Sequence, residues 1–258
     1  MGVKTFISLD EANKLFALHR FTKLLPTSSG IIDTTYIADN HILKKYEREV
    51  DVQRDTELLK ILLEKGLNVA TCVANSQEWY LYQKLNGVEP RVIKTYHVIA
   101  LARFLSAFHS ITYKKYYRKK MIDKDEINYL LDFTKKKFYS YYKKLEPLKE
   151  YNSKSEGLIH GDIFKDNTLF DRQKIAVFDF IDSACGNFAF DMAVALIGFD
   201  ALKHRHYFIN IFLNTYNQHA PKKVIKQELL KEIDFAQRFY ALKRIVNYKN
   251  TKKAKELL

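Results

Sequence analysis

The sequence predicts an α+β fold of two lobes, a small β-rich lobe at residues 1–86 and a larger, mainly helical lobe at residues 87–258. The first observation is the order of the predicted elements before residue 86, which is strand, strand, helix, strand, strand. The second is the change after Gly87 and Pro90, where helical periodicity takes over. Short strands are predicted in the second lobe around 157–160, 168–170 and 174–180. We therefore expect a boundary near residue 86.

The first lobe is predicted to begin with a short helix and a hairpin. Ser8 precedes Glu11 by three residues, as in a capping box, and an apolar stripe follows. The stripe consists of Ala12, Leu15, Phe16 and Leu18. Two β-rich segments, 34–38 and 41–46, then flank the turn dipeptide Asp39-Asn40, which predicts a hairpin.

A second helix and a second pair of strands complete the first lobe. Apolar residues recur at helical spacing over residues 50–65, and Gly66 is expected to end this helix. Residues 69–73 and 78–85 then predict two strands, separated by the polar residues 75–77.

The composition predicts a folded, cytoplasmic protein. Of the 258 residues, 47% are hydrophobic, which is sufficient for a substantial core. We see neither a signal-peptide pattern nor an apolar run of membrane-spanning length, so we expect neither export nor membrane insertion. Cys72 and Cys185 lie far apart and without a second Cys or His at ligand spacing, so neither a disulfide framework nor a zinc site is predicted.

The net charge of +13 at pH 7 raises the alternative of a polyanion-binding protein. Residues 111–154 concentrate this charge, with 13 basic and 6 acidic side chains, which leaves +7. The segment also contains apolar residues at roughly helical spacing, among them Ile127, Leu130 and Leu131. We therefore expect much of the charge to cover the solvated face of a helix, and nucleic-acid binding is the less favoured interpretation.

The stretch from His160 to Asn167, His-Gly-Asp-Ile-Phe-Lys-Asp-Asn, carries the strongest functional signal. Asp162 supplies one carboxylate, Asn167 an amide five residues later, and Asp179 a second carboxylate twelve residues beyond that. This set of groups is suited to phosphoryl transfer from ATP. We predict that Asp162 accepts the proton of a substrate hydroxyl, and that Asn167 and Asp179 supply oxygen ligands to Mg²⁺.

A predicted hairpin explains how Asp179 returns to this loop. The strands 168–170 and 175–178 flank the turn 171–173, so the second strand runs back toward the loop. An alternative is that the polar residues of the loop only cap and tie it. The position of Asp179 at hairpin distance, together with an upstream lysine, favours the catalytic interpretation.

That lysine is Lys44, which follows the apolar pair Ile42-Leu43 in a predicted strand and is placed to reach the phosphates of ATP. Lys45 is the competing residue, because adjacent strand residues point to opposite faces of a sheet. An acid should orient the lysine. Glu57, on the following helix, is our choice, and Asp55 is the alternative.

These motifs resemble the aminoglycoside phosphotransferase superfamily, the protein-kinase-like small-molecule kinases whose catalytic loop is written H-G-D-x-x-x-x-N. The resemblance extends over nearly the whole chain and is closer still to the homoserine kinases of this fold. Residues 158–170 resemble their L-H-x-D-L-F-R-D-N-V-L-F stretch, and residues 179–186 resemble their D-F-Y-N-A-C run. Phe190-Asp191-Met192-Ala193 looks like their Y-D-L-A, and Ala241-Leu242-Lys243-Arg244 looks like their A-L-R-F.

The resemblance implies a protein-kinase-like bilobal fold, with residues 1–86 as the nucleotide-binding lobe and residues 87–258 as the catalytic and substrate-binding lobe. It implies ATP and Mg²⁺ as cofactors and a small-molecule hydroxyl acceptor. The acceptor it implies is L-homoserine, whose phosphorylation is a step toward threonine. Backbone groups near Gln83 and Leu85 should meet adenine in the resembled family.

Other residues receive supporting interpretations. The phosphate-covering loop near residues 26–30 has a single glycine, so its contacts are not assigned. Asp191 is expected to hydrogen-bond the catalytic loop from a helix start, and His109 is expected to be a core histidine. Arg238 and Arg244, on the late helix, are candidates for acceptor contacts by position.

The acceptor stays open among several classes. Related kinases phosphorylate antibiotics, choline, sugars and amino acids on one scaffold. A different class of function is a basic kinase-like scaffold that binds RNA or a protein partner without turnover. The presence of Lys44, Asp162, Asn167 and Asp179 favours an enzyme. The sequence does not predict the oligomeric state.

Overall fold

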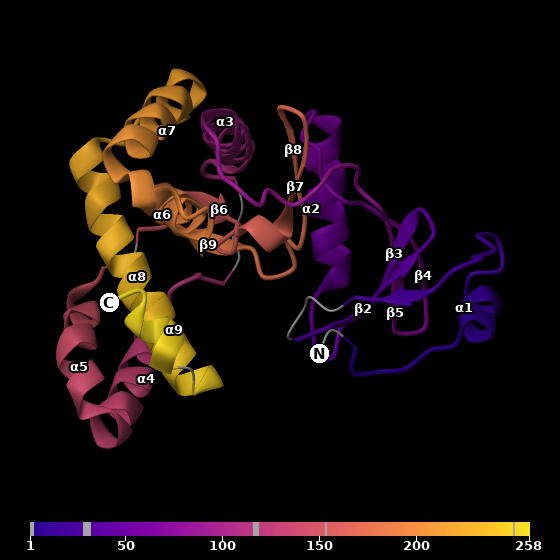
Figure 1. Cartoon of the computed structure of the whole chain (residues 1–258), viewed down its shortest axis with the longest axis horizontal. Helices are drawn as coiled ribbons and strands as arrows, with labels where there is room; N and C mark the ends of the chain where they lie inside the picture. Colours follow the sequence, from indigo (N-terminus) through magenta and orange to yellow (C-terminus); the bar gives the residue numbers. More distant parts are fainter. Residues whose placement is uncertain (1–2, 28–31, 116–118, 153, 250) are drawn as a thin grey trace. The chain divides into compact units, whose positions relative to one another are not determined.

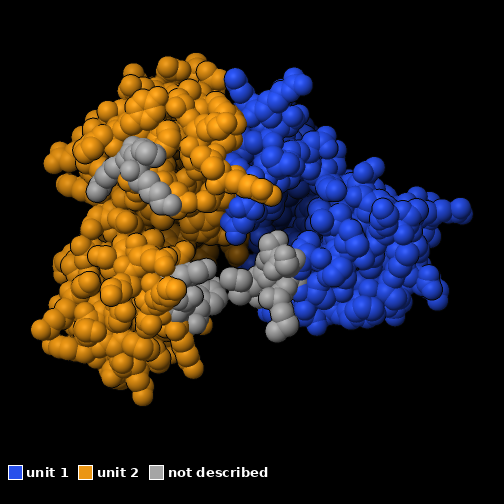
Figure 2. All heavy atoms as spheres, in the orientation of Figure 1, with its two compact units in different colours: residues 1–90, 166–181 blue, residues 91–165, 182–258 orange. Residues whose placement is uncertain are grey.

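The computed structural model describes residues 3–27, 32–115, 119–152, 154–249 and 251–258, except for the side chains at 203–205, 248 and 253. The chain forms two compact units, which are coloured separately in Figure 2. Unit 1 comprises Met1–Pro90 and Asp166–Ile181, and unit 2 comprises Arg91–Lys165 and Asp182–Leu258. Unit 1 is rich in strands and unit 2 in helices, so the predicted α+β class is confirmed.

The division into compact units differs in detail from the predicted functional lobes. The first unit extends to Pro90, and it includes residues 166–181, which we had assigned by sequence to the second lobe. The assignment of nucleotide binding to residues 1–86 and of catalysis to residues 87–258 stays a prediction.

Unit 1 contains a five-stranded antiparallel sheet (Figure 1). Its strands are β1 (Leu25–Pro26), β2 (Thr34–Ala38), β3 (His41–Lys45), β4 (Cys72–Ser76) and β5 (Trp79–Gln83), in the order β1-β2-β3-β5-β4. β2 and β3 pair with Ala38 opposite His41, which confirms the predicted hairpin. Its turn residue Asp39 has a φ of 50°, a left-handed conformation that aspartate tolerates.

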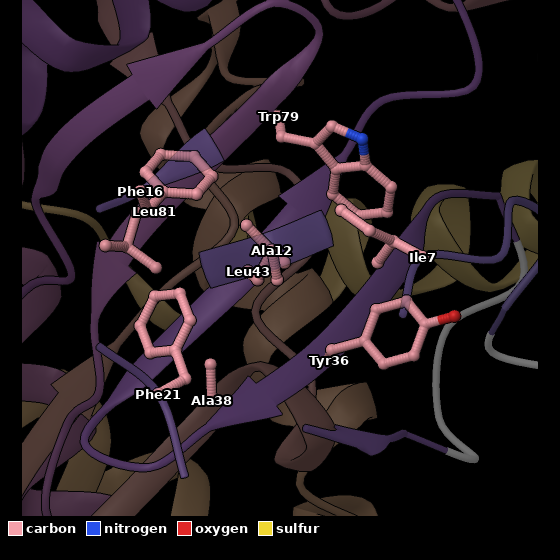
Figure 3. Packing of buried hydrophobic residues seen from close by; sticks show 9 residues of the cluster. All are labelled: Ile7, Ala12, Phe16, Phe21, Tyr36, Ala38, Leu43, Trp79 and Leu81. Carbon is pink, nitrogen blue, oxygen red and sulfur yellow. The ribbon is translucent and has the colours of Figure 1, made fainter. Parts of the chain in front are cut away.

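An apolar cluster covers one face of this sheet (Figure 3). It consists of Ile7, Ala12, Phe16, Phe21, Tyr36, Ala38, Leu43, Trp79 and Leu81. Helix α1 (Leu9–Leu15) contributes Ala12. The N–H of Glu11 donates to the Ser8 hydroxyl at 3.2 Å, and the N–H of Ser8 donates to the Glu11 carboxylate at 2.8 Å. The predicted capping box and first helix are therefore confirmed. Leu18, which we expected on the apolar face of this helix, instead lies beyond its end and is 98% exposed.

Helix α2 (Val52–Glu64) confirms the second predicted helix. Asp51 caps its start by accepting a hydrogen bond from the N–H of Arg54 at 3.1 Å. Gly66 follows its end with a φ of 85°, the left-handed conformation that a glycine adopts readily after a helix.

The strand predicted at residues 69–73 lies later in the chain, as β4. Asn75 and Ser76, which were expected in a polar connection, pair with Tyr80 and Trp79. β4 is the last strand of the sheet, and its alternate residues are exposed, so polar side chains are tolerated there.

A second hairpin belongs to unit 1. The short turn η2 (Lys165–Asn167) precedes β7 (Thr168–Asp171), which pairs with β8 (Lys174–Val177). The predicted hairpin is therefore confirmed, with its turn at Arg172 and Gln173.

Unit 2 is mainly helical, as predicted. Its helices are α3 (Thr95–Thr112), α4 (Lys124–Lys137), α5 (Tyr139–Leu145), α6 (Phe188–Gly198), α7 (Arg205–His219), α8 (Lys226–Tyr248) and α9 (Thr251–Lys255), with the short turns η1 (Glu146–Glu150) and η3 (Ala201–His204). α3 packs against α7, and α6 packs against α8. β6 (Gly157–Ile159) pairs with β9 (Ala184–Gly186), a strand that the sequence did not predict.

The basic segment forms amphipathic helices. In α4, Ile127, Leu130 and Leu131 are buried, whereas Lys124 and Lys135 to Lys137 are exposed. The expected solvated helix face is confirmed there. Residues 116–118 of this segment lie outside the described residues. Within the described part of the chain, no helix has both the length and the apolar character needed to cross a membrane.

Candidate active site

Asn167 directly precedes β7 and Asp179 follows β8, so the second hairpin of unit 1 brings these two residues to its open end. Thr168 pairs with Val177 at the open end of the hairpin. The N–H of Phe178 donates to the carbonyl of Asn167 at 3.2 Å. The two predicted metal-binding residues therefore lie at the same end of one hairpin.

Lys44 of β3 contacts this end of the hairpin. Its Nζ donates to Oδ1 of Asp179 at 2.8 Å, and its side chain is only 12% exposed. Nζ of Lys45 instead donates to the exposed Glu78 at 2.7 Å, as expected for a neighbour that points to the opposite face. The predicted choice of Lys44 over Lys45 agrees with this geometry. Nζ of Lys44 also lies 4.7 Å from the ring centre of Tyr46, a cation–π contact.

The backbone of Asp179 has an uncommon conformation. Its φ is 66°, in the left-handed region that residues other than glycine seldom occupy. Aspartate tolerates this region better than most residues. Such conformations concentrate at functional sites, so the outlier supports a special role for Asp179.

The acid beside Lys44 is one that we did not identify from the sequence. A carboxylate oxygen of Asp33 lies 3.6 Å from Nζ of Lys44, and the Asp33 side chain is 9% exposed. Glu57 is exposed and accepts a hydrogen bond from a side chain one turn earlier in α2. Among the described residues, the ion pairs of Lys44 are with Asp33 and Asp179, so the structure does not bring Glu57 to the lysine.

Asp55, the alternative partner, is buried. Burial raises the pKa of Tyr46 and of Tyr82, and the negative charge of Asp55 adds to this effect.

The only signal that could have found Asp33 is the strand register. Thr34 lies opposite Lys45, so the residue before β2 comes beside the end of β3.

In unit 2, strand β6 leads directly into the loop that carries Asp162. Asp191 of α6 is fully buried and holds the backbone of this loop. It accepts hydrogen bonds from the N–H of His160 at 3.0 Å and from the N–H of Gly161 at 2.7 Å. Nε2 of His109 lies 3.0 Å from the same carboxylate. The expected supporting position of Asp191 is confirmed.

Asp191 carries a negative charge in this buried place. Burial acts to raise its pKa, but the hydrogen bond and the charge of His109 and the N–H of Gly161 outweigh it, and the pKa of Asp191 lies below its usual value. His109 also bonds the Tyr216 hydroxyl through Nδ1 at 2.8 Å and stacks on Phe188 with ring centres 4.0 Å apart. His109 is therefore a core histidine, as predicted.

The same loop requires a glycine next to Asp162. Gly161 has a φ of 74°, and a Cβ added to it would lie 2.2 Å from Cε of Met121. The N–H of Asp162 donates to Nδ1 of His160 at 3.2 Å. The position of Asp162 is thus fixed through the backbone around it.

The predicted nucleotide contacts at Gln83 and Leu85 follow the end of β5. The N–H of Gln83 donates to the carbonyl of Thr71 at 2.9 Å, and the N–H of Lys84 donates to the carbonyl of Asn40 at 3.2 Å. Their role toward adenine stays a prediction. Residues 28–30 of the expected phosphate-covering loop lie outside the described residues.

The two arginines of α8 have different surroundings. Arg238 donates from Nε to Asp234 at 2.9 Å and from Nη1 to the carbonyl of Lys144. It therefore links α8 to α5 and is poorly suited to hold an acceptor. Arg244 lies one helical turn after Tyr240, and its positive charge acts on the hydroxyl of that tyrosine.

The donor set in unit 1 suits Mg²⁺. The carboxylate of Asp179 and the side-chain oxygen of Asn167 are hard oxygen ligands, and Mg²⁺ commonly combines one or two such ligands with phosphate oxygens and water. The Asp179 side chain is 37% exposed, so an ion could reach it.

An α+β fold that places Lys44, Asn167 and Asp179 together is the arrangement expected of a phosphotransferase. The chain belongs to the phosphotransferase enzyme family known as APH, whose sequence profile matches residues 23–216, or 194 of the 258 residues. The predicted resemblance is confirmed at this level. No curated protein sequence matches the chain.

Solved structures with similar folds include enzymes of antibiotic phosphorylation. An APH(2") enzyme in its GDP and kanamycin complex is 15% identical, with 95% of this chain and 93% of that chain covered and a TM-score of 0.72. The apoenzyme of a macrolide 2'-phosphotransferase from Brachybacterium faecium is 15% identical over 97% of both chains, with a TM-score of 0.68. Amicoumacin kinase with AMP-PNP, Ca²⁺ and Ami is 14% identical over 96% and 92%, with a TM-score of 0.70. At these identities the likeness establishes the kinase-like fold.

Proposed function

We propose that this protein is an ATP-dependent small-molecule kinase that transfers the γ-phosphate of ATP to a hydroxyl group. The observation that carries this proposal is the contact of Lys44 with Asp179 at 2.8 Å, at the hairpin end that also bears Asn167. A lysine, an amide oxygen and a carboxylate are the groups that such enzymes use to hold phosphates and a metal ion. Family membership supports the same class of reaction.

Each residue has a distinct role in this proposal. Lys44 binds phosphate oxygens of ATP, and Asp33 keeps its ammonium oriented. Asn167 and Asp179 would hold Mg²⁺, which when bound neutralises charge on the phosphates. Asp162 orients the acceptor hydroxyl and takes up its proton. Transfer is direct, without a phosphorylated enzyme.

Nucleotide binding is assigned to residues 1–86, and catalysis and acceptor binding are assigned to residues 87–258. In the first of these, the backbone from Gln83 to Leu85 contacts adenine. Because the N–H of Gln83 is bonded to Thr71, adenine would meet the carbonyl of Gln83 and the backbone of Leu85. We expect the enzyme to act in the cytoplasm.

The acceptor that we propose is L-homoserine, which gives O-phospho-L-homoserine on the way to threonine. The support is the resemblance of residues 158–170 and 179–186 to the motifs of homoserine kinases. An amino acid needs a cation for its carboxylate. Arg244 suits this role better than Arg238, which already bonds Asp234 and Lys144.

A second group of acceptors is supported by the structural neighbours. Their names refer to macrolides, kanamycin and amicoumacin, so an antibiotic is the main alternative. Choline or a sugar would use the same chemistry. A basic scaffold that binds nucleic acid or a protein without turnover is the alternative of a different class, and the pairing of Lys44 with Asp179 disfavours it.

An acceptor screen tests the proposal. Purified protein with ATP and Mg²⁺ is offered L-homoserine, choline, a set of sugars, kanamycin and a macrolide, and mass spectrometry detects phosphorylated products. We expect phosphohomoserine from the wild type and almost none from Asp162→Asn, which keeps the size of the side chain but removes the base.

Two other results would change the conclusion. Phosphorylation of an antibiotic alone would keep the kinase and replace its acceptor. Binding of ATP without product from any acceptor would refute the kinase and favour the scaffold.

A further inference from the structure

The loop that carries Asp162 is held from two different helices. Asp191 of α6 accepts the N–H of Gly161 at 2.7 Å. The carbonyl of the same residue accepts a hydrogen bond from the hydroxyl of Tyr240 on α8. Gly161 is thus bonded at both its N–H and its carbonyl, and this carbonyl belongs to the peptide that joins it to Asp162.

The ring of Tyr240 is also fixed in place. It meets Phe164 of the same loop edge to face, with ring centres 5.6 Å apart, and it meets Phe239 in the same manner at 5.6 Å. Phe164 in turn packs against Gly198, where an added Cβ would lie 2.2 Å from its ring. Tyr240 therefore contacts the loop on both sides of Asp162.

The Tyr240 hydroxyl remains a donor at every pH of a kinase assay. Burial, followed by the negative charges of Asp162 and Asp191, raises its pKa well above 10. A group that stays protonated does not itself take the proton of an acceptor. Its contribution must come through the backbone that it holds.

We propose that Tyr240 is a positioning residue, whose hydrogen bond to the Gly161 carbonyl sets the orientation of the Asp162 carboxylate for phosphoryl transfer. This inference rests on the proposed function, because Asp162 is there the residue that receives the acceptor proton. A bond to the peptide adjoining a catalytic residue governs its direction, and small misplacements of such a group strongly reduce turnover.

The test compares Tyr240→Phe with Tyr151→Phe. The first variant keeps the ring packing and removes the hydroxyl that bonds Gly161. The second removes the hydroxyl of Tyr151, which donates to Glu232 of α8 at 2.9 Å. The Tyr151 ring stacks on Phe235 of α8, with ring centres 3.4 Å apart. The control thus also removes one tyrosine hydroxyl beside or on α8, at a site that does not contact the loop that carries Asp162.

Turnover and binding are measured with ATP, Mg²⁺ and the acceptor found in the screen. We expect Tyr240→Phe to lower kcat about 10- to 100-fold with little change in the KM for ATP. Tyr151→Phe should retain wild-type kcat. If both variants show the same kcat as the wild type, Tyr240 is only a packing residue and the proposal is wrong.

Hydrogen exchange of the peptide spanning residues 158–164 provides a readout without activity. Tyr240→Phe should exchange faster there than the wild type, and Tyr151→Phe should not. Unchanged exchange in Tyr240→Phe would overturn the proposal even if turnover fell. If the wild type phosphorylates no acceptor, the proposed function fails, and the exchange comparison alone decides whether Tyr240 holds the loop.

Discussion

The two compact units hold their candidate site residues in different ways. In unit 1, Lys44 and Asp179 contact each other directly through their charged ends, and Asp179 is 37% exposed. In unit 2, buried groups hold the backbone around Asp162, since Asp191 bonds the N–H of His160 and of Gly161. The first arrangement joins two partly exposed side chains, and the second fixes a loop through buried hydrogen bonds.

This difference suggests a division of tasks. The Lys44–Asp179 ion pair is only partly exposed, with the Lys44 side chain at 12% and that of Asp179 at 37%, and a pair of this kind contributes about 1 kcal/mol or less. Lys44 can therefore give up this contact for a phosphate oxygen, and Asp179 for a metal ion, at small cost. A buried carboxylate with several donors is costly to disturb. Unit 1 is therefore suited to binding a charged ligand, and unit 2 to keeping Asp162, the proposed base, in a constant position.

Asp162→Ala should give the largest effect and would separate the two tasks. We expect kcat to fall about 10²- to 10⁴-fold, because the acceptor loses its base, while the affinity for ATP stays nearly unchanged. Steady-state kinetics and calorimetric titration with ATP and Mg²⁺ measure the two quantities. Asp166→Ala, an exposed carboxylate in the same loop, is the control. Retained activity in Asp162→Ala would remove this residue from its role.

Asp179→Ala should act on binding instead. We expect the affinity for ATP in the presence of Mg²⁺ to fall about tenfold or more, because one oxygen ligand is lost. Binding of ATP without a divalent ion should change less. Asp171→Ala, at the far end of the same hairpin, serves as the control in titrations with and without Mg²⁺. Equal Mg²⁺ dependence in wild type and Asp179→Ala would contradict the metal assignment.

A smaller effect distinguishes the acids around Lys44. Asp33→Asn should weaken ATP binding about two- to fivefold, because a partly buried ion pair contributes roughly 0.5–1 kcal/mol to the position of the lysine. Glu57→Gln, at an exposed position, should leave ATP binding unchanged. The KM for ATP of both variants checks this. The opposite result would restore Glu57 as the partner of Lys44.

The stability of the protein should also depend on pH through a buried carboxyl group of unit 2. Glu232 accepts hydrogen bonds from Tyr151 at 2.9 Å and from Asn187, which caps α6, at 3.0 Å. Burial raises the pKa of Glu232 to about 7. The native protein thus binds this proton more tightly than the unfolded chain, whose glutamate has a pKa near 4.5. Its contribution to stability is therefore complete below pH 4.5 and is lost as the pH rises through 7.

Urea unfolding at pH 5 and pH 8 measures this effect. The wild type should lose on the order of 2 kcal/mol of unfolding free energy between these values through Glu232. Glu232→Gln should reduce the loss, whereas Glu126→Gln, at an exposed position, should not. Equal pH dependence in all three proteins would show that Glu232 does not titrate in this range.

Local signals made much of the fold predictable. Ser8 and Glu11 cap the first helix as their spacing predicts, and Asp39 turns the first hairpin. These features depend on residues within a few positions of one another, so a sequence pattern contains them. β4 was displaced because its pairing at the edge of the sheet tolerates the polar Asn75 and Ser76, which sequence propensity assigns to a loop.

The candidate site was predictable only where the spacing of residues along the chain sets the geometry. Asn167 and Asp179 come together through a short hairpin, which the sequence encodes locally. Asp33 and Tyr240 gave no such signal. Asp33 reaches Lys44 across neighbouring strands, and Tyr240 reaches Gly161 from 79 residues away. Contacts of this kind depend on how elements pack, which propensity and periodicity do not determine.

The left-handed backbone of Asp179 limits how this position can vary. Among the residues with an oxygen ligand, aspartate and asparagine enter this conformation most easily. Glutamate, whose side chain is longer, would have to adopt the same unfavourable backbone conformation and would also present its carboxylate at a different distance from the ion. Directed evolution of metal preference in this protein should therefore accept fewer types of residue at Asp179 than at Asn167.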